Sequence, residues 1–424
     1  MKFLQVFKRL KFGKTAWSFI WYAGGMYFFY LCRWLMNIAA ARMSASYENA
    51  GLLVLAVSIT NIWSAFALFS MRNIQVSDIN DEFTDSEYVS SRIITALLST
   101  ALCIGQVLLF TKGIYQVLVI SMYMLFVAGM ALADVMHGIL QKHWRLGVVG
   151  TSYMIKGVVT LSAFMLLLHF WGMLYAVAGM MLLTMVTIFM FDIRFARKYA
   201  SIKISMNFRR LLPLFKICLP LVIVTFLSFL IPSIARIALE KVTDTETLGI
   251  YGSVTLPATI MQTAILATFA PFMNILTKNY KEKAYKRFAK TFWIGAGGIT
   301  AVFAVFIGVV HVYGAWVIKL LFGAAIVPYA YLFTEASILC FFMTSAAYTS
   351  LPLIIFRCNK IIMALYAAGN IVFAALLFPM IRRFSLSGAN YVQIIAFAVV
   401  TVALFVTVII IFKREFNKSE AAAE

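Results

Sequence analysis

The sequence predicts an all-α integral membrane protein with about 12 transmembrane helices, arranged as two six-helix bundles around a central cleft, with both termini in the cytoplasm. Three observations support this fold class. Hydrophobic residues make up 63% of the 424-residue chain and charged residues 12%, for a mean hydropathy of +0.92. Apolar runs of about 20 residues, the length that crosses a hydrocarbon core of about 30 Å, recur along the whole chain. Lysine and arginine gather in alternate loops.

Apolar runs and the polar breaks between them define the expected spans in order. They cover residues 17–41, 50–70, 89–111, 116–138, 147–168, 172–192, 213–238, 250–273, 291–312, 331–356, 361–381 and 388–412. The third span has the clearest start, because Thr84 and Glu87 form a capping-box pattern ahead of an apolar run. The short connectors leave no room for a soluble catalytic domain, so function is expected within the helices.

The Lys/Arg bias of the loops orients the chain. Segments on one side, including both termini and Lys216 at the inner end of the seventh span, hold 26 of the 36 Lys and Arg residues. The other side holds 6, and the remaining 4 lie within spans. The side rich in Lys and Arg is cytoplasmic by the positive-inside rule. The net charge of +20 is therefore mainly a topology signal, and no nucleic-acid partner is expected. Residues 1–16 mix five cations with apolar side chains, which favours an amphipathic helix on the membrane surface.

An internal duplication is also indicated. The pattern Glu-x-x-Gly occurs at residues 48–51 and 246–249, just before the second and the eighth span. The predicted domains are a basic N-terminal segment (1–16), a first bundle (17–192), a basic linker (193–212), a second bundle (213–412) and a tail (413–424). A parallel repeat places the substrate path between its two bundles.

Charged residues within the spans are candidate functional residues, because an ionised side chain at mid-bilayer costs about 2.5–3.5 kcal/mol and usually faces a lumen. Arg33 and Lys156 each lie about 12 Å from a span end at 1.5 Å per residue, and we expect no acid at comparable depth. Such a cationic lumen suits a phosphate or diphosphate. Four further charged residues lie within about a turn of a span end: Arg92, Asp134, Arg236 and Glu335. For each, two interpretations stay open: the side chain extends to the membrane–water interface, or it has a functional role.

Polar side chains in the spans leave two interpretations open. They could donate hydrogen bonds to sugar hydroxyls, or they could join helices at about 0.6 kcal/mol each. These residues are Asn37, Asn61, Gln106, Gln262, Asn274 and Asn370. The acids Asp78, Asp81 and Glu82, in the loop before the third span, similarly form either a solvated loop or a cytoplasmic gate. In such a gate they would pair with Arg72, Arg92 or the basic inner loops.

Motifs for covalent chemistry are not found in the sequence. It contains no Walker motif, no HExxH and no Cys-x-x-Cys, and its five cysteines fall in or at the ends of spans. We therefore expect no catalytic residues, no metal and no cofactor.

Three segments carry a resemblance to a known family. They are SMRNIQVSD at 70–78 with Phe83 and Glu87–Arg92, ALADVMHGILQK at 131–142 with Arg145, and LGIYGS at 248–253 with Pro257, Gln262 and Ala270–Pro271. These segments resemble bacterial polysaccharide repeat-unit (O-antigen or capsule type) flippases of the multidrug/oligosaccharidyl-lipid/polysaccharide exporter superfamily. The twelve spans and the basic inner loops fit that family over the whole chain.

The resemblance implies a non-enzymatic transporter in the bacterial cytoplasmic membrane. It would flip a lipid-linked, usually undecaprenyl-diphosphate-linked, oligosaccharide by alternating access. Arg33 and Lys156 would hold the diphosphate, with Arg92 and Arg236 as secondary contacts and Asn37 and Gln262 as polar contacts. Asp134 or Glu335 would carry a coupling proton or ion. The lipid bilayer, a polysaccharide polymerase and a chain-length regulator are the implied partners.

Two other classes remain as alternatives. A multidrug or other secondary antiporter of the same superfamily would place acids deep in the first-half lumen, where this chain is expected to carry cations. A membrane polysaccharide polymerase or glycosyltransferase would need a long outer loop with catalytic carboxylates. The longest outer loop, about residues 313–330, is mostly apolar.

Overall fold

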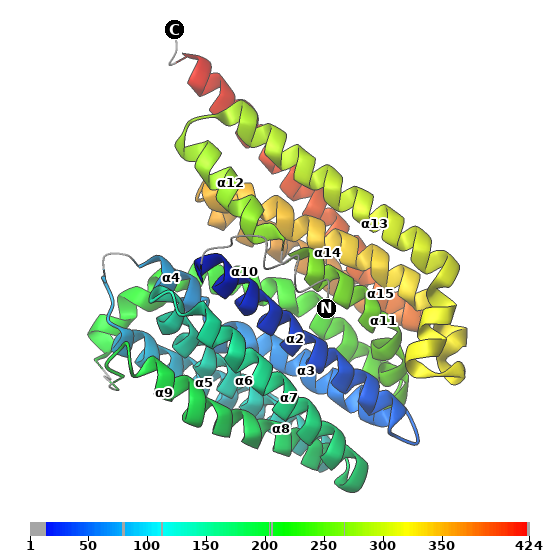
Figure 1. Ribbon diagram of the computed structural model, residues 1–424. Coiled ribbons are helices and arrows are strands. Elements are labelled where there is room, and N and C mark those ends of the chain that lie inside the picture. Colours follow the sequence, from blue (N-terminus) through cyan, green and yellow to red (C-terminus); the bar gives the residue numbers. More distant parts are fainter. Residues whose placement is uncertain are drawn as a thin grey trace, which may run out of the picture. The chain divides into compact units, whose positions relative to one another are not determined.

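The computed structural model describes residues 14–421, apart from residues 79, 80, 112, 203, 205, 206 and 267. All regular structure in this part of the chain is helical (Figure 1). The helices are α2 (Lys14–Arg42), α3 (Glu48–Leu68), α4 (Met71–Ser77), α5 (Asp85–Phe110), α6 (Ile114–Lys142), α7 (Leu146–Trp171), α8 (Met173–Thr187), the π-helical turn η1 (Ile188–Asp192), α9 (Ile193–Ala196), α10 (Phe208–Val242), α11 (Thr245–Leu266), α12 (Phe269–Lys281), α13 (Tyr285–Phe322), the 3-10 turn η2 (Ala324–Tyr329), α14 (Tyr331–Ile355) and α15 (Asn359–Ala421). Most of the expected surface helix at 1–16 lies outside the described residues.

The helices confirm the all-α membrane fold class. Nine helical segments of the described chain are long and apolar enough to cross a membrane. Helices α2 and α11, with 29 and 22 residues, are also long enough to do so. Helix α15 consists of two arms that meet at Ser385, whose φ of 51° and ψ of −123° are not helical. Counting α2, α11 and the second arm of α15 by length alone gives twelve spans, the number that the sequence predicts.

The two arms of α15 form an antiparallel hairpin. A Cβ atom on Gly388 would overlap the carbonyl oxygen of Met380, and one on Gly369 would overlap the side chain of Val400. Because glycine has no side chain, the arms approach each other closely along their length.

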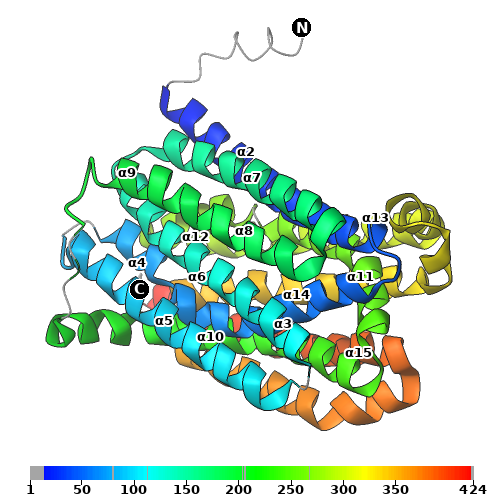
Figure 2. The same cartoon turned by 90° about the horizontal axis from the view of Figure 1, so that it is seen from below.

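The chain forms two compact units. The first contains the described residues up to Ala39 and Trp63–Val222, and the second contains Ala40–Ile62 and the described residues from Ile223 onward. In the first unit, α6 packs against α5 and α8, and α7 packs against α8; Figures 1 and 2 show α6, α7 and α8 side by side. In the second unit, α14 packs against α11, α13 and α15, and Figure 1 shows α13 running along α14.

The predicted capping box at the start of the third span is confirmed. The Thr84 hydroxyl accepts a hydrogen bond from the Glu87 backbone N–H at 3.3 Å, and the Glu87 carboxylate accepts one from the Thr84 backbone N–H at 2.8 Å. Two otherwise unsatisfied donors at the start of α5 are thereby paired.

The repeated Glu-x-x-Gly segments meet within the second unit. A Cβ on Gly51 would overlap the carbonyl oxygen of Thr245, and a Cβ on Gly249 would overlap the carbonyl oxygen of Tyr47. Tyr47 and Thr245 occupy equivalent places in the two segments, four residues before each glycine. The same close contact is thus made in both directions between the two segments.

Candidate functional site

The first unit holds a buried ion pair between Lys156 and Asp192. Lys156 lies on α7 and Asp192 is the last residue of η1, and both side chains are fully buried. The Lys156 ammonium donates to the Asp192 carboxylate and, at 2.9 Å, to the Ser152 hydroxyl one turn earlier. The expectation that no acid lies near Lys156 is therefore wrong. The reason is that a helical side chain tilts toward the helix N-terminus. The Lys156 ammonium therefore reaches toward the N-terminal end of α7, where it meets Asp192.

His137 on α6 completes this cluster. Its Nε2 lies 3.1 Å from the Ser152 hydroxyl and 3.3 Å from the Asp192 carboxylate. The ring packs edge-on against Tyr153, with centroids 4.8 Å apart. His137 Nδ1 is buried without a hydrogen-bond partner among the described residues. One carboxylate thus joins α6, α7 and η1 in the interior of the unit.

A second cluster centres on Asp134 of α6. Its two carboxylate oxygens accept from Arg72 of α4 at 3.1 Å and from Arg92 of α5 at 2.9 Å. The Arg92 side chain is fully buried and also donates to the carbonyl oxygens of Ala67 and Leu68, the last residues of α3. Arg92 therefore caps the C-terminal end of α3, where a cation is favoured by the helix dipole. Neither Arg92 nor Asp134 is an isolated charge at the interface.

Arg72 links this cluster to its surroundings. Besides Asp134, it donates to the hydroxyls of Tyr22 at 3.2 Å and Tyr153 at 3.5 Å, and to the side-chain oxygen of Gln141 at 3.0 Å. Because Tyr153 also contacts His137, the two buried clusters adjoin. The structure pairs Arg72 and Arg92 with Asp134, and not with the loop acids, which leaves the basic inner loops as the partners that the gate hypothesis also named.

The loop acids have other partners. Asp78 accepts from the backbone N–H groups of Glu82 at 2.9 Å and Phe83 at 3.1 Å, and from the Tyr88 hydroxyl at 3.1 Å. Partial burial opposes ionisation of Asp78, but these hydrogen bonds and the nearby Lys142 charge outweigh it, so the pKa of Asp78 lies below its ordinary value. Exposed Asp81 forms an ion pair with Lys142 at 2.5 Å, whereas Glu82 is exposed.

Arg33 on α2 differs from the other three intramembrane cations of this unit. Its guanidinium donates to the Tyr123 hydroxyl at 2.5 Å and lies 5.7 Å from the centroid of the Phe126 ring. Asn37 donates to the Arg33 backbone carbonyl at 3.0 Å. Within the described residues Arg33 forms no ion pair, so its charge is balanced only by a hydroxyl and an aromatic face.

The second unit places Glu335 and Arg236 near a polar group of side chains. Glu335 on α14 accepts from Ser387 at 2.8 Å and from Asn390 at 2.9 Å, and the Tyr251 hydroxyl donates to the Asn390 oxygen at 2.7 Å. Arg236 on α10 is close enough to interact electrostatically with Tyr251. Arg236 also forms no ion pair within the part of the chain that the structure describes.

The remaining predicted contact, Gln262 on α11, lies 3.7 Å from the Cys340 thiol. Other polar residues of the spans join helices: Gln106 accepts from the Trp63 indole at 2.6 Å, and Asn370 donates to the Leu227 carbonyl at 3.0 Å. Among the described residues, no group of three or more His, Cys, Asp or Glu side chains is placed to hold a metal ion.

Asp192 is the functional candidate that sequence analysis missed. A signal for it existed, because Asp192 is the one acid within the expected span 172–192. With it, the charged side chains of the two clusters, taken together with Arg33, are four cations (Arg33, Arg72, Arg92, Lys156) and two acids (Asp134, Asp192). This group of described residues therefore keeps a cationic excess, and Arg33 is its cation without a carboxylate.

Long apolar helices around buried charges define a multi-pass membrane protein. Comparison with solved structures identifies its fold as that of the multidrug/oligosaccharidyl-lipid/polysaccharide (MOP) exporter superfamily. The chain is similar to an inward-facing multidrug resistance transporter of the MATE family of this superfamily, with a TM-score of 0.71 and 12% identity over 91% of this chain and 95% of that one. It is also similar to the lipid II flippase MurJ in an inward closed conformation, with a TM-score of 0.68 and 13% identity over 92% and 87% of the two chains.

Sequence comparison gives a weaker likeness. No protein-family model matches the chain. The capsular polysaccharide biosynthesis protein CapF of Staphylococcus aureus is 26% identical over 292 residues, which cover 66% of this chain and 71% of that protein. The resemblance inferred from the sequence is confirmed at the level of the superfamily fold, and a location in the bacterial cytoplasmic membrane is in keeping with it.

Proposed function

We propose that this protein flips a lipid-linked oligosaccharide, attached through undecaprenyl diphosphate, across the cytoplasmic membrane by alternating access, for surface polysaccharide biosynthesis. Similarity to a capsular polysaccharide biosynthesis protein and to a lipid II flippase supports this substrate class. No covalent bond changes in such a step, so the proposed activity is transport and not catalysis. A polysaccharide polymerase and a chain-length regulator are the partners that would use the exported product.

The observation that carries the proposal is the half-buried guanidinium of Arg33. Burying a cation without a carboxylate is costly, and the hydroxyl of Tyr123 and the ring of Phe126 compensate it only in part. A diphosphate would supply the missing negative charge through charge-assisted hydrogen bonds. Arg236, which also lacks an ion pair among the described residues, is the corresponding candidate in the second unit, with Asn37 and Gln262 as polar contacts.

Lys156 and Arg92 take a different part in this proposal from the one that the sequence suggested. Each is fully buried against an acid, so each would contact the diphosphate only after leaving that acid. We assign them to holding α5, α6, α7 and η1 in place. Asp134 and Glu335 stay the candidates for a coupling proton or ion, since each is a partly exposed carboxylate within a span.

Export in a strain that lacks its own flippase tests the proposal. Arg33→Ala should lower surface polysaccharide about tenfold or more, because one lost charge-assisted contact of about 1.5 kcal/mol corresponds to that factor. Lipid-linked intermediates should accumulate on the inner side, with membrane abundance near wild type. Arg209→Ala, which removes an exposed arginine at the start of α10, is the matched control and should export normally. Full export by Arg33→Ala would overturn the proposal.

A secondary antiporter is the second candidate, because the structure does place an acid, Asp192, deep in the first unit. Asp192 is neutralised there by Lys156, which weakens this alternative. Efflux of cationic drugs that persists in Arg33→Ala but is lost in Asp192→Asn would favour the antiporter over the flippase.

A further inference from the structure

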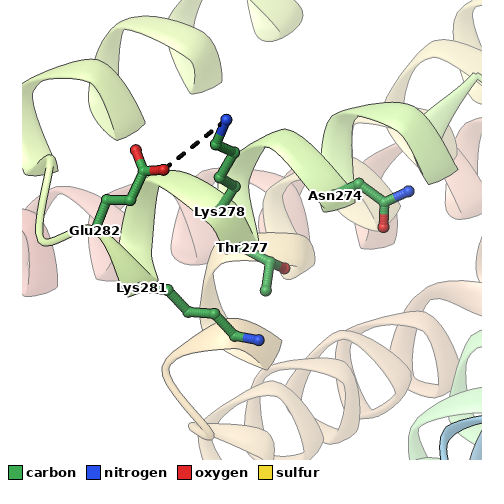
Figure 3. A pocket seen from close by; sticks show the side chains of 5 residues that line it. All are labelled: Asn274, Thr277, Lys278, Lys281 and Glu282. Carbon is green, nitrogen blue, oxygen red and sulfur yellow. Dashed lines mark ion pairs between the residues drawn. The ribbon is translucent and has the colours of Figure 1, made fainter.

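A cavity of about 400 Å³ opens beside α12, on the side of the chain that the Lys/Arg bias assigns to the cytoplasm. Its lining comes from one helix: Asn274, Thr277, Lys278, Lys281 and Glu282. Figure 3 shows the Lys278 amine turned toward Glu282, at 3.8 Å, while Lys281 extends to the other side. Lys281 and the side chains of Thr277 and Asn274 make no hydrogen bond or ion pair within the described residues, so three donors remain for a ligand.

Aromatic packing fixes the helix that carries these donors. With 13 residues, α12 is too short to cross the bilayer. Its other face is held by Tyr280, whose ring lies 5.1 Å from that of Phe356 and 6.4 Å from that of Phe288, and by Phe272 against Tyr348 at 6.0 Å. The polar face of α12 is therefore directed away from these aromatic contacts, and the cavity does not depend on a mobile loop.

The surroundings of the cavity are strongly cationic. Between residues 274 and 290 the chain carries six basic residues (Lys278, Lys281, Lys283, Lys286, Arg287, Lys290) and one acid, Glu282. Glu282 is already engaged by Lys278. The ligand that this environment attracts is an anion.

The residues that follow the basic cluster on α13 indicate which kind of anion binds. Immediately after Lys290, the side chains of Trp293 and Ile294 are exposed apolar surface, 47% and 60% accessible, as lipid-facing residues are. A tryptophan next to a cluster of lysines is typical of the membrane–water interface, and clusters of Lys and Arg at this level attract anionic headgroups. Exposed Ile275 next to Asn274 adds apolar surface at the rim.

We propose that the α12 cavity binds the phosphate group of a membrane lipid at the cytoplasmic surface, through Lys281, Thr277 and Asn274. The lipid is either the polyprenyl diphosphate carrier or an anionic phospholipid of the inner leaflet, since both present the same phosphate chemistry. The proposal does not rest on Arg33 or on the proposed transport function.

Lipid binding by the purified full-length protein in phosphatidylcholine nanodiscs tests this inference, with undecaprenyl diphosphate and phosphatidylglycerol as two separate probes. The double variant Lys281→Gln/Thr277→Val should bind at least one probe about tenfold more weakly, because it loses a charge-assisted and a hydroxyl hydrogen bond. Lys286→Gln removes the same charge from the exposed surface of α13, outside the cavity, and should change binding by less than about twofold.

The probe that responds to the double variant identifies the lipid, and a response by both indicates a general phosphate site. Equal losses in the double variant and in Lys286→Gln would mean diffuse electrostatic attraction and would overturn the proposal, as would no loss for either probe. Phosphatidylglycerol is not the substrate of the proposed transport, so weaker binding of this probe by the double variant would stand even if the flippase hypothesis failed.

Discussion

Lys156 and Asp192 show how a buried charge can stabilise a bundle without facing a substrate. Both side chains are fully buried, and each charge would be costly alone. Replacing both charges of a buried pair is often tolerated, whereas removing one leaves the other uncompensated at a cost of about 3–5 kcal/mol. Lys156 is thus expected to matter first for the stability of the first unit.

We predict that Lys156→Met lowers the thermal unfolding midpoint and the membrane abundance of the protein, because Asp192 loses its cation. The double variant Lys156→Met/Asp192→Asn should recover most of that loss, since it removes both charges and keeps a polar group beside Ser152 and His137. Unfolding midpoints of the two variants in the same detergent measure the difference. A single variant as stable as wild type would show that the pair contributes little.

Sequence analysis placed Lys156 in the membrane but missed Asp192, so it could not pair the two charges. Counting residues from span ends gives the depth of a Cα atom, whereas a lysine side chain extends several ångströms along its helix. The π-turn η1, which precedes α9 and carries Asp192, also has no signature in an apolar run. Arg33, by contrast, was singled out by depth alone, and in the structure it forms no ion pair with any described residue.

At the scale of helices, the crossing of α3 and α11 depends on two glycines. Gly51 lies against the backbone of Thr245 and Gly249 against the backbone of Tyr47. Backbone cannot move aside as a flexible side chain can, so any side chain at either glycine must push the helices apart. The repeated Glu-x-x-Gly pattern therefore has a steric explanation that its spacing alone did not provide.

Gly51→Ala and Gly249→Ala should each lower the thermal unfolding midpoint, because overpacking at a close contact costs about 1–3 kcal/mol. Gly105→Ala on α5 is the matched control: a Cβ there meets no atom within 4 Å, and alanine is favoured over glycine in a helix by about 1 kcal/mol. If all three variants unfold at the same temperature, the close crossing is not a constraint in the membrane.

Most element boundaries followed hydropathy, but two expectations were wrong. Helix α13 runs on to Phe322, ten residues beyond the expected span 291–312, and so takes in part of the expected outer loop 313–330. The expected span 250–273 is not one helix, because α11 ends at Leu266 and α12 begins at Phe269. Pro271 offers a signal in hindsight: it lies in the first turn of α12, where a missing backbone N–H removes no helical hydrogen bond. The bend at Ser385, by contrast, follows the polar break expected between residues 381 and 388.

At the scale of the whole molecule, the distribution of Lys and Arg decides which ends of the helices face the cytoplasm. The bias is 26 residues to 6, and it is counted over short loops, where the rule holds best. Both the proposed direction of transport and the position of the α12 cavity depend on this orientation. A direct test of sidedness therefore bears on both.

Cysteine labelling in intact cells supplies that test. In a variant with the half-buried Cys358 replaced by serine, the other four native cysteines are buried and should not react. Single cysteines at Val242 and Phe384, whose side chains are 41% and 42% exposed, should react with a membrane-impermeant reagent from outside. Cysteines at exposed Ser201 and Ile204 should react only after the membrane is permeabilised, because their linker lies on the Lys/Arg-rich side. Labelling of Ser201→Cys or Ile204→Cys in intact cells would contradict the orientation. It would also place the α12 cavity on the outer surface, away from the inner leaflet that the lipid-binding proposal requires.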